Sequence, residues 1–203
     1  MPNWCHNQLT IQGTDDELNA IRDLLEGENE VLDFEQVKPT PRDLEDFVSD
    51  TTVKNVNEIK DEDLEWQSHS KPSQEQNLKK HGFASWYEFH IAEWGTKWNA
   101  CDPSLDDNGD RLIYTFDTAW SPPGPIVLKL SELFPNAEFE LKYIELGMSF
   151  AGTYSVCNSV ESDEMYDYRS KQWDEIALNF GFEDLLEELD KEDLVAKDLT
   201  TTQ

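Results

Sequence analysis

Residues 111–147 read RLIYTFDTAWSPPGPIVLKLSELFPNAEFELKYIELG, and this stretch decides the fold class. Its first part, 112–118, places an apolar or Thr side chain at every second position, the period of a strand with one buried face. The rigid turn 121–125 leads into a helix with apolar residues at helical spacing, which Pro135 ends. At 139–143 apolar and charged residues alternate again, so the stretch is one β-α-β unit.

The same reading extends outward in both directions. Trp4 to Gln12 alternates like a half-buried strand, and Thr14 and Glu17 form a capping box that starts a helix. A second strand is predicted near Val31–Val37, and a last one at Met148–Val156. The order is therefore β-α-β, a long insert, then β-α-β-β. This order predicts an α+β sandwich of the ferredoxin-like kind with an antiparallel sheet.

Three regions follow from composition. Residues 1–158 are predicted to form the ferredoxin-like domain, interrupted at 42–110 by a polar insert. The insert contains a Trp-rich helix near residues 83–94 and a hairpin turn signal, Asp-Asn-Gly, at 107–109. Residues 159–203 are predicted to be an acidic helical extension with two short amphipathic helices.

The chain is strongly acidic. Its 203 residues include 44 acidic and 16 basic side chains, which gives a net charge of −28 and a pI near 4.2. Phosphates repel such a surface, so direct nucleic-acid binding through a general basic face is excluded. No long apolar run and no basic, apolar leader are present, which predicts a soluble cytoplasmic protein with no membrane contact.

Tryptophans mark the first candidate site. Trp94, Trp98 and Trp120, with Lys97 among them, fit a platform for stacking a base or a ligand. Rings of this size also fill cores that are short of aliphatic side chains, and this core role is the favoured interpretation.

Charged residues on predicted core strands mark the second candidate site. His6, Asp117 and Glu145 have the chemistry for acid–base catalysis or metal binding. Charges on strands more often face solvent, and no nucleophile elbow, phosphate loop or zinc-ligand spacing supports an enzyme. We therefore assign no catalytic residue, no metal and no cofactor.

Several strings resemble motifs of the YubB-like family of phage and plasmid proteins. They are PNWCHNQLTIQG at 2–13, WGTKWNA at 94–100, FDTAWSPP at 116–123 and YIELG at 143–147, with Phe134-Pro135, Phe150 and Gly152. The resemblance covers about residues 1–158. It implies a ferredoxin-like domain and an origin on a mobile element, and it implies no established activity.

The acidic surface is the third candidate site. A net charge of −28 on an estimated 9,800 Å² of surface is about one charge per 350 Å². A DNA duplex carries about one per 110 Å², so mimicry of DNA requires that the charges be concentrated on one face. The residues that supply such a face are Asp61, Glu62, Asp63, Glu65, Asp163, Glu164, Glu183, Asp184, Glu187 and Glu188. Plain solubility is the competing interpretation.

These observations leave three functional hypotheses. The first is a non-enzymatic, phage- or plasmid-encoded binding protein, a DNA mimic with an anti-defence role such as anti-restriction or anti-CRISPR. It would present negative charge to a basic host protein that handles nucleic acid. The second is an enzyme or nucleotide-binding module centred on the tryptophans with Asp117 and Glu145. The third is a structural or oligomerisation role for the helical extension.

Overall fold

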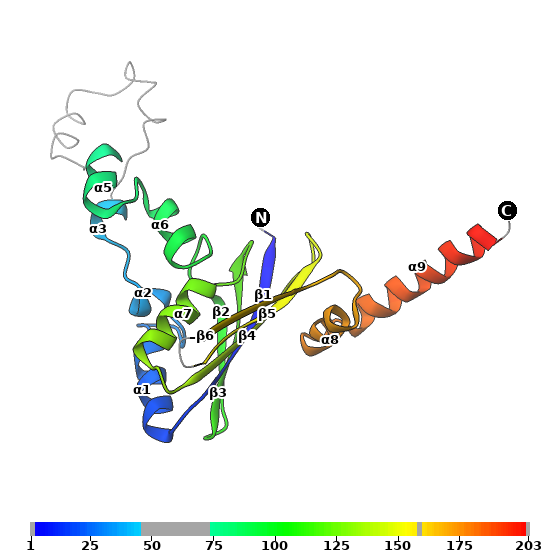
Figure 1. The fold of residues 1–203 in the computed structure, drawn as a ribbon, viewed down its shortest axis with the longest axis horizontal. Helices are drawn as coiled ribbons and strands as arrows, with labels where there is room; N and C mark the ends of the chain where they lie inside the picture. The colour runs from blue at the N-terminus through cyan, green and yellow to red at the C-terminus, as the bar shows by residue number, and fades with distance from the viewer. Residues whose placement is uncertain (1–2, 46–73, 158–159, 202–203) are drawn as a thin grey trace, which may run out of the picture.

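One six-stranded antiparallel sheet organises the protein (Figure 1). The computed structural model describes residues 3–45, 74–157 and 160–201. The strands lie in the spatial order β2-β3-β1-β4-β5-β6, and each neighbouring pair is antiparallel. Their bounds are β1 Trp4–Gln12, β2 Cys101–Asp107, β3 Arg111–Ala119, β4 Glu138–Glu145, β5 Phe150–Cys157 and β6 Val160–Tyr166.

The first four strands and two helices form a ferredoxin-like unit. Helix α1 (Asp15–Leu25) lies between β1 and β2 in the chain, and α7 (Gly124–Leu133) lies between β3 and β4. Strand β3 separates β1 from β2 in the sheet, and β1 separates β3 from β4, which is the split β-α-β arrangement. Both helices pack on one face, over a common core. The predicted α+β, ferredoxin-like fold is confirmed, and β5 and β6 extend its sheet.

The N-terminal segment folds as its pattern predicts. Every second residue of β1 is buried, and the residues between them are partly or fully exposed. Thr14 and Glu17 form the predicted capping box, in which the Glu17 backbone N–H donates to Thr14 Oγ1 at 3.4 Å and the Thr14 N–H donates to Glu17 Oε2 at 3.0 Å. This cap fixes the start of α1 and thereby aims its apolar face at the sheet.

The strand predicted at Val31–Val37 is wrong, because Phe34–Val37 forms a one-turn helix, α2. Asp33 caps this turn, since its Oδ1 accepts a hydrogen bond from the Glu35 N–H at 3.0 Å. Both apolar ends of the turn are buried, at i and i+3, a spacing that places them on one face of a helix but on opposite faces of a strand.

The second strand of the ferredoxin-like unit is β2, which lies within the stretch 42–110 that was predicted to be an insert, so the end of that prediction is wrong. Its sequence CDPSLDD holds three Asp and one Pro, residues that are depleted in strands. An edge position tolerates them, because one side of an edge strand needs no ladder hydrogen bonds and charge there discourages pairing with other chains. The predicted Asp-Asn-Gly turn joins β2 to β3, with Gly109 at φ 80°.

The described part of the insert contains short helices. They are α3 (Arg42–Glu45), α5 (Gln74–His81) and α6 (Trp86–Glu93). Helix α6 confirms the predicted Trp-rich helix, and Gly95, at φ 81°, redirects the chain after it. A Cβ at Gly95 would lie 2.7 Å from Pro125 Cδ, so the chain turns tightly against the start of α7.

The C-terminal region begins with a strand, although helix was predicted there. Residues 160–166 form β6, which pairs with β5 along its length. Helix α8 (Lys171–Asn179) then packs on the opposite face of the sheet from α1 and α7, with Trp173 against Ile144 and Ala151. Helix α9 (Glu183–Thr201) follows the predicted break at Gly181 and projects away from the sheet (Figure 1).

Candidate functional site

Trp94 belongs to the core, as the favoured interpretation predicts. Its side chain is 2% exposed, its ring stacks on His90 with 3.7 Å between centroids, and its Nε1–H donates to the Lys38 carbonyl at 2.9 Å. His90 is bound on both ring nitrogens, to Thr40 Oγ1 at 2.9 Å and to the Lys97 carbonyl at 2.8 Å. Burial lowers the pKa of His90, which favours the neutral ring in this stack.

Trp98 and Trp120 lie on the surface, and here the core interpretation is wrong. They are 37% and 41% exposed. The ammonium of Lys97 lies 4.9 Å from the centroid of the Trp98 ring, 5.2 Å from that of Trp120 and 5.9 Å from that of Tyr87. We call these four residues, with Trp4, whose ring is 6.2 Å from Trp98, the aromatic cluster. Three of its rings hold one cation by cation–π attraction.

The backbone at Trp120 is strained. Its φ is 73°, a left-handed conformation that bulky residues rarely adopt. Neighbouring hydrogen bonds hold it there: the Trp120 N–H donates to the Asn3 carbonyl at 3.0 Å, and Ser121 Oγ donates to the Gly95 carbonyl at 2.6 Å. Strain of this kind persists only where the surroundings enforce it, and it often accompanies function. The enforced turn keeps the Trp120 ring exposed beside Lys97.

Asp117 and His6 form a pair on the face of the sheet that carries α8. Nδ1 of His6 lies 2.7 Å from Oδ1 of Asp117, across β1 and β3. The His6 ring also contacts the rings of Phe180 and Phe182, with centroids 6.4 and 5.3 Å away. The hydrogen bond with Asp117 raises the pKa of His6 despite partial burial. The pair therefore helps to hold the α8–α9 junction on the sheet.

This pair predicts a pH-dependent stability. Because the folded-state pKa of His6 exceeds 6.5, the stabilisation is fully present below that pH and is lost as pH rises through the folded pKa. We expect Asp117→Asn to lower the free energy of unfolding more at about pH 6 than at about pH 8.5, measured by urea denaturation. Asp106→Asn, which removes a carboxylate that accepts from Asn108, serves as the control with a constant cost. An Asp117→Asn cost that stays equal or grows with pH would contradict the assignment.

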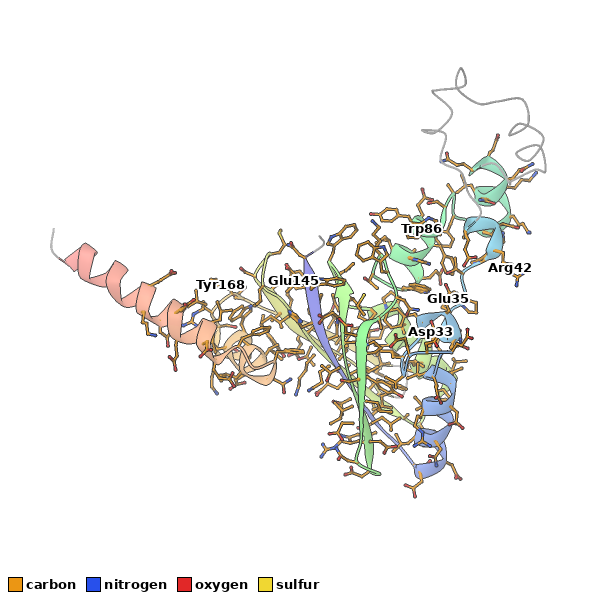
Figure 2. All side chains as sticks on the ribbon, turned by 180° about the vertical axis from the view of Figure 1, so that it is seen from behind. Asp33, Glu35, Arg42, Trp86, Glu145 and Tyr168 are labelled. Carbon is orange, nitrogen blue, oxygen red and sulfur yellow. The ribbon has the colours of Figure 1, made fainter. Side chains whose placement is uncertain are left out.

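Glu145 is sealed at the end of β4. Its side chain is 1% exposed, and its two carboxylate oxygens accept hydrogen bonds from the Gly147 N–H at 2.7 Å and the Met148 N–H at 2.6 Å. Figure 2 shows Glu145 beside the start of β1, where it opposes Cys5. It shares the core face of the sheet with Cys5, whereas His6 and Asp117 lie on the other face. The candidate grouping of His6, Asp117 and Glu145 is therefore not assembled, and Glu145 instead fixes the β4–β5 turn.

The predicted acidic residues do not form one face. Asp163 and Glu164 are neighbours on β6, so their side chains point to opposite faces of the sheet. Glu183, Asp184, Glu187 and Glu188 are all exposed on α9. The other predicted set, Asp61, Glu62, Asp63 and Glu65, lies outside the described residues. Of the described helices and strands, α9 contains the largest number of acidic residues, eight among its 19.

Pattern reasoning missed a cleft between α7 and the β4-β5-β6 end of the sheet. It has a volume of about 790 Å³ and is lined from both sides by apolar, aromatic and charged residues. Glu161 and Asp163 on β6 and Tyr143 and Tyr154 on the adjoining strands contribute its polar groups. Glu161 and Asp163 are two residues apart in the sequence. This spacing places both on one face only if the segment is a strand, and a strand was not predicted there.

The part of the chain that the structure describes contains neither a metal centre nor a membrane-spanning helix. No group of three His, Cys, Asp or Glu side chains in residues 3–45, 74–157 and 160–201 is arranged to hold a metal ion. In those same ranges, no helix combines the length and the apolar character required to cross a membrane.

Comparison with known proteins supports the fold. Residues 93–192, just under half of the chain, match the family model described as a ferredoxin-like domain in Api92-like protein. The crystal structure of a protein api92 from Yersinia pseudotuberculosis is similar, with a TM-score of 0.52 and 15% identity over 84% of this chain and 99% of that one. No curated protein matches. At this identity the likeness shows a shared fold.

Proposed function

We propose that this chain is a non-enzymatic binding protein of a phage or plasmid that uses helix α9 to engage a basic surface on a host protein that handles nucleic acid. The observation that carries the proposal is the concentration of charge on α9. The helix has eight acidic and two basic residues among its 19, a net charge of −6. The mobile-element origin rests on the resemblance of the motif strings at 2–13, 94–100 and 116–123.

The charge spacing on α9 supports mimicry of a nucleic-acid strand. At a rise of 1.5 Å per residue the helix is about 28 Å long, so it carries about one net charge per 5 Å. One strand of DNA carries about one charge per 3.4 Å. The helix therefore comes within a factor of about 1.5 of a single strand, and within about threefold of a duplex, which carries about one charge per 1.7 Å.

The test compares two variants with equal net charge. The first neutralises α9 by Glu183→Gln, Asp184→Asn, Glu187→Gln and Glu188→Gln. The matched control neutralises four exposed acids near the end of α1 by Asp23→Asn, Glu26→Gln, Glu28→Gln and Glu30→Gln. Each protein is immobilised, exposed to a bacterial lysate at about 50 mM and about 300 mM salt, and the bound proteins are identified.

We expect the wild type and the control to retain nucleic-acid-handling proteins at low salt, and random-sequence duplex DNA to release them. The α9 variant should retain about tenfold less, because neutralising four charges weakens attraction to a basic surface. Equal retention by the α9 variant and the wild type, or complexes insensitive to salt and DNA, would contradict the proposal. A change in self-association on neutralising α9 would point instead to the oligomerisation role.

A second candidate function is nucleotide binding at the aromatic cluster. The exposed rings of Trp98 and Trp120, with the Lys97 ammonium between them, combine a stacking surface with a cation for phosphate. We expect a bound mononucleotide to quench tryptophan fluorescence in the wild type, and Trp120→Ala to abolish most of that response. Quenching that is equal in both proteins would dismiss this candidate.

A further inference from the structure

The cleft between α7 and the β4-β5-β6 end of the sheet has the properties of a small-ligand site. Its volume of about 790 Å³ lies within the range of ligand pockets, about 300–1,000 Å³. The walls are largely apolar and aromatic, with Pro125 and Leu128 on the helix side and Phe150 and Met165 on the sheet side. Such walls hold a carbon stem, and the class of ligand is decided by the polar groups among them.

Two carboxylates lie on the sheet side, each with a tyrosine hydroxyl. Tyr154 donates from Oη to Glu161 Oε2 at 2.6 Å, and Tyr143 donates to Asp163 Oδ1 at 3.4 Å. Burial and the adjacent acids raise the pKa of both tyrosines, so each hydroxyl keeps its proton and acts as a donor. Glu161 and Asp163 are two residues apart on β6, and therefore both face the cleft.

The two lysines that line the cleft are paired with carboxylates other than Glu161 and Asp163. Lys38 Nζ lies 2.6 Å from Glu93 Oε2, and Lys129 Nζ lies 2.8 Å from Glu132 Oε2. Within residues 3–45, 74–157 and 160–201, no Lys, Arg or His forms an ion pair with Glu161 or Asp163. The two pairs cancel, so the cleft carries two uncompensated negative charges beside aromatic rings.

From this arrangement we infer that the cleft binds an organic cation, an ammonium or guanidinium group on an apolar stem, with Glu161 and Asp163 as its charge partners. Carboxylates bind such groups through charge-assisted hydrogen bonds, and the apolar walls accommodate the stem. The cation comes either from a free small molecule or from a basic side chain of a protein. This inference does not depend on the function proposed for α9.

Edge protection is the competing explanation for these acids. Strand β6 is the last strand of the sheet, and charges on such strands discourage pairing with other chains. Glu164 would serve that purpose as well, since it lies on the same strand and points to the opposite face. A comparison of Glu161 and Asp163 with Glu164 therefore separates a binding role from edge protection.

The experiment uses pairs of probes that differ only in charge. n-Butylguanidinium is compared with n-butylurea as the free ligand, and a Gly-Arg-Gly amide with a Gly-citrulline-Gly amide as the peptide. Binding is measured on the full chain by titration calorimetry and by amide chemical shifts. The variants are Glu161→Gln with Asp163→Asn, and the control Glu164→Gln.

We expect at least one cationic probe to bind at least tenfold more tightly than its neutral partner, with shifts at β6 and α7. The double variant should lose most of that difference, while Glu164→Gln should stay within about twofold of the wild type. Preference for butylguanidinium identifies a free ligand, and preference for the arginine peptide identifies a protein side chain. The inference is overturned if neither cation binds better than its neutral partner, or if Glu164→Gln loses as much as the double variant.

Discussion

Replacing Trp94 by alanine is expected to lower the free energy of unfolding by about 3–5 kcal/mol, the range for deleting a fully buried aromatic side chain. The ring is 2% exposed and packs edge-on against Phe34, with 5.8 Å between centroids. Its loss would also remove the stack on His90 and leave the Lys38 carbonyl without its indole donor. Urea denaturation of both proteins at one pH measures the difference.

The two other motif tryptophans provide the controls. Trp98→Ala and Trp120→Ala should each cost less than about 1 kcal/mol, because their rings are exposed. At φ 73°, Trp120→Gly should be more stable than Trp120→Ala by about 1 kcal/mol, since glycine relieves the left-handed strain. Equal costs for Trp94→Ala and Trp98→Ala would refute the division into core and surface.

This contrast shows how far a sequence pattern reaches. Trp94 and Trp98 are four residues apart, a spacing that puts both on one face of a helix. The helix ends before that spacing can apply, because Gly95 takes φ 81° and redirects the chain. The first ring is therefore buried and the second exposed. The spacing of the two tryptophans does not specify the direction of the chain after Gly95, and that direction decides which ring is buried.

The elements that were predicted correctly have patterns that tertiary contacts reinforce. Strand β1 alternates over nine residues and lies between β3 and β4. A shift of one residue in its register would expose every buried side chain, so the pattern determines which face is buried. The two strands that were missed, β2 and β6, lie at the edges of the sheet and are rich in acids. Acidic side chains lower strand propensity and resemble a solvated tail, but an edge strand needs only one partner.

The acidic composition of the edge strand β6 is also the reason that the sequence did not predict the cleft. With 159–203 interpreted as helix, Glu161 and Asp163 are two of many surface acids. Once they are placed on a strand, their spacing of two residues directs both into the cleft beside α7. Tyr143 reaches Asp163 from β4, two strands away, and sequence distance gives no indication of this contact.

Gly152 on β5 leaves room for Tyr143 to reach Asp163 across that strand. We expect Gly152→Ala to lower the free energy of unfolding by about 3 kcal/mol, the upper part of the range for overpacking a core. A Cβ at this position would lie 2.6 Å from Tyr143 Cζ, still closer to the Tyr143 hydroxyl, and 2.5 Å from the Glu164 carbonyl oxygen. The carbonyl belongs to the backbone of β6, so relief requires that β6 shift or that the tyrosine leave Asp163.

Gly124→Ala is the matched control, because a Cβ at Gly124 meets nothing within 4 Å. It lies at the start of α7 directly before Pro125, whose ring disfavours the helical region for a residue with a Cβ, so we expect alanine to cost much less here than at Gly152. Urea denaturation compares the two alanine variants, and backbone amide shifts report whether β6 moves in Gly152→Ala. If both variants unfold at the same urea concentration, the contact across β5 does not constrain the sheet. If Gly152→Ala alone is destabilised, close packing of Tyr143 over Gly152 holds both the outer strands and the acidic wall of the cleft in place.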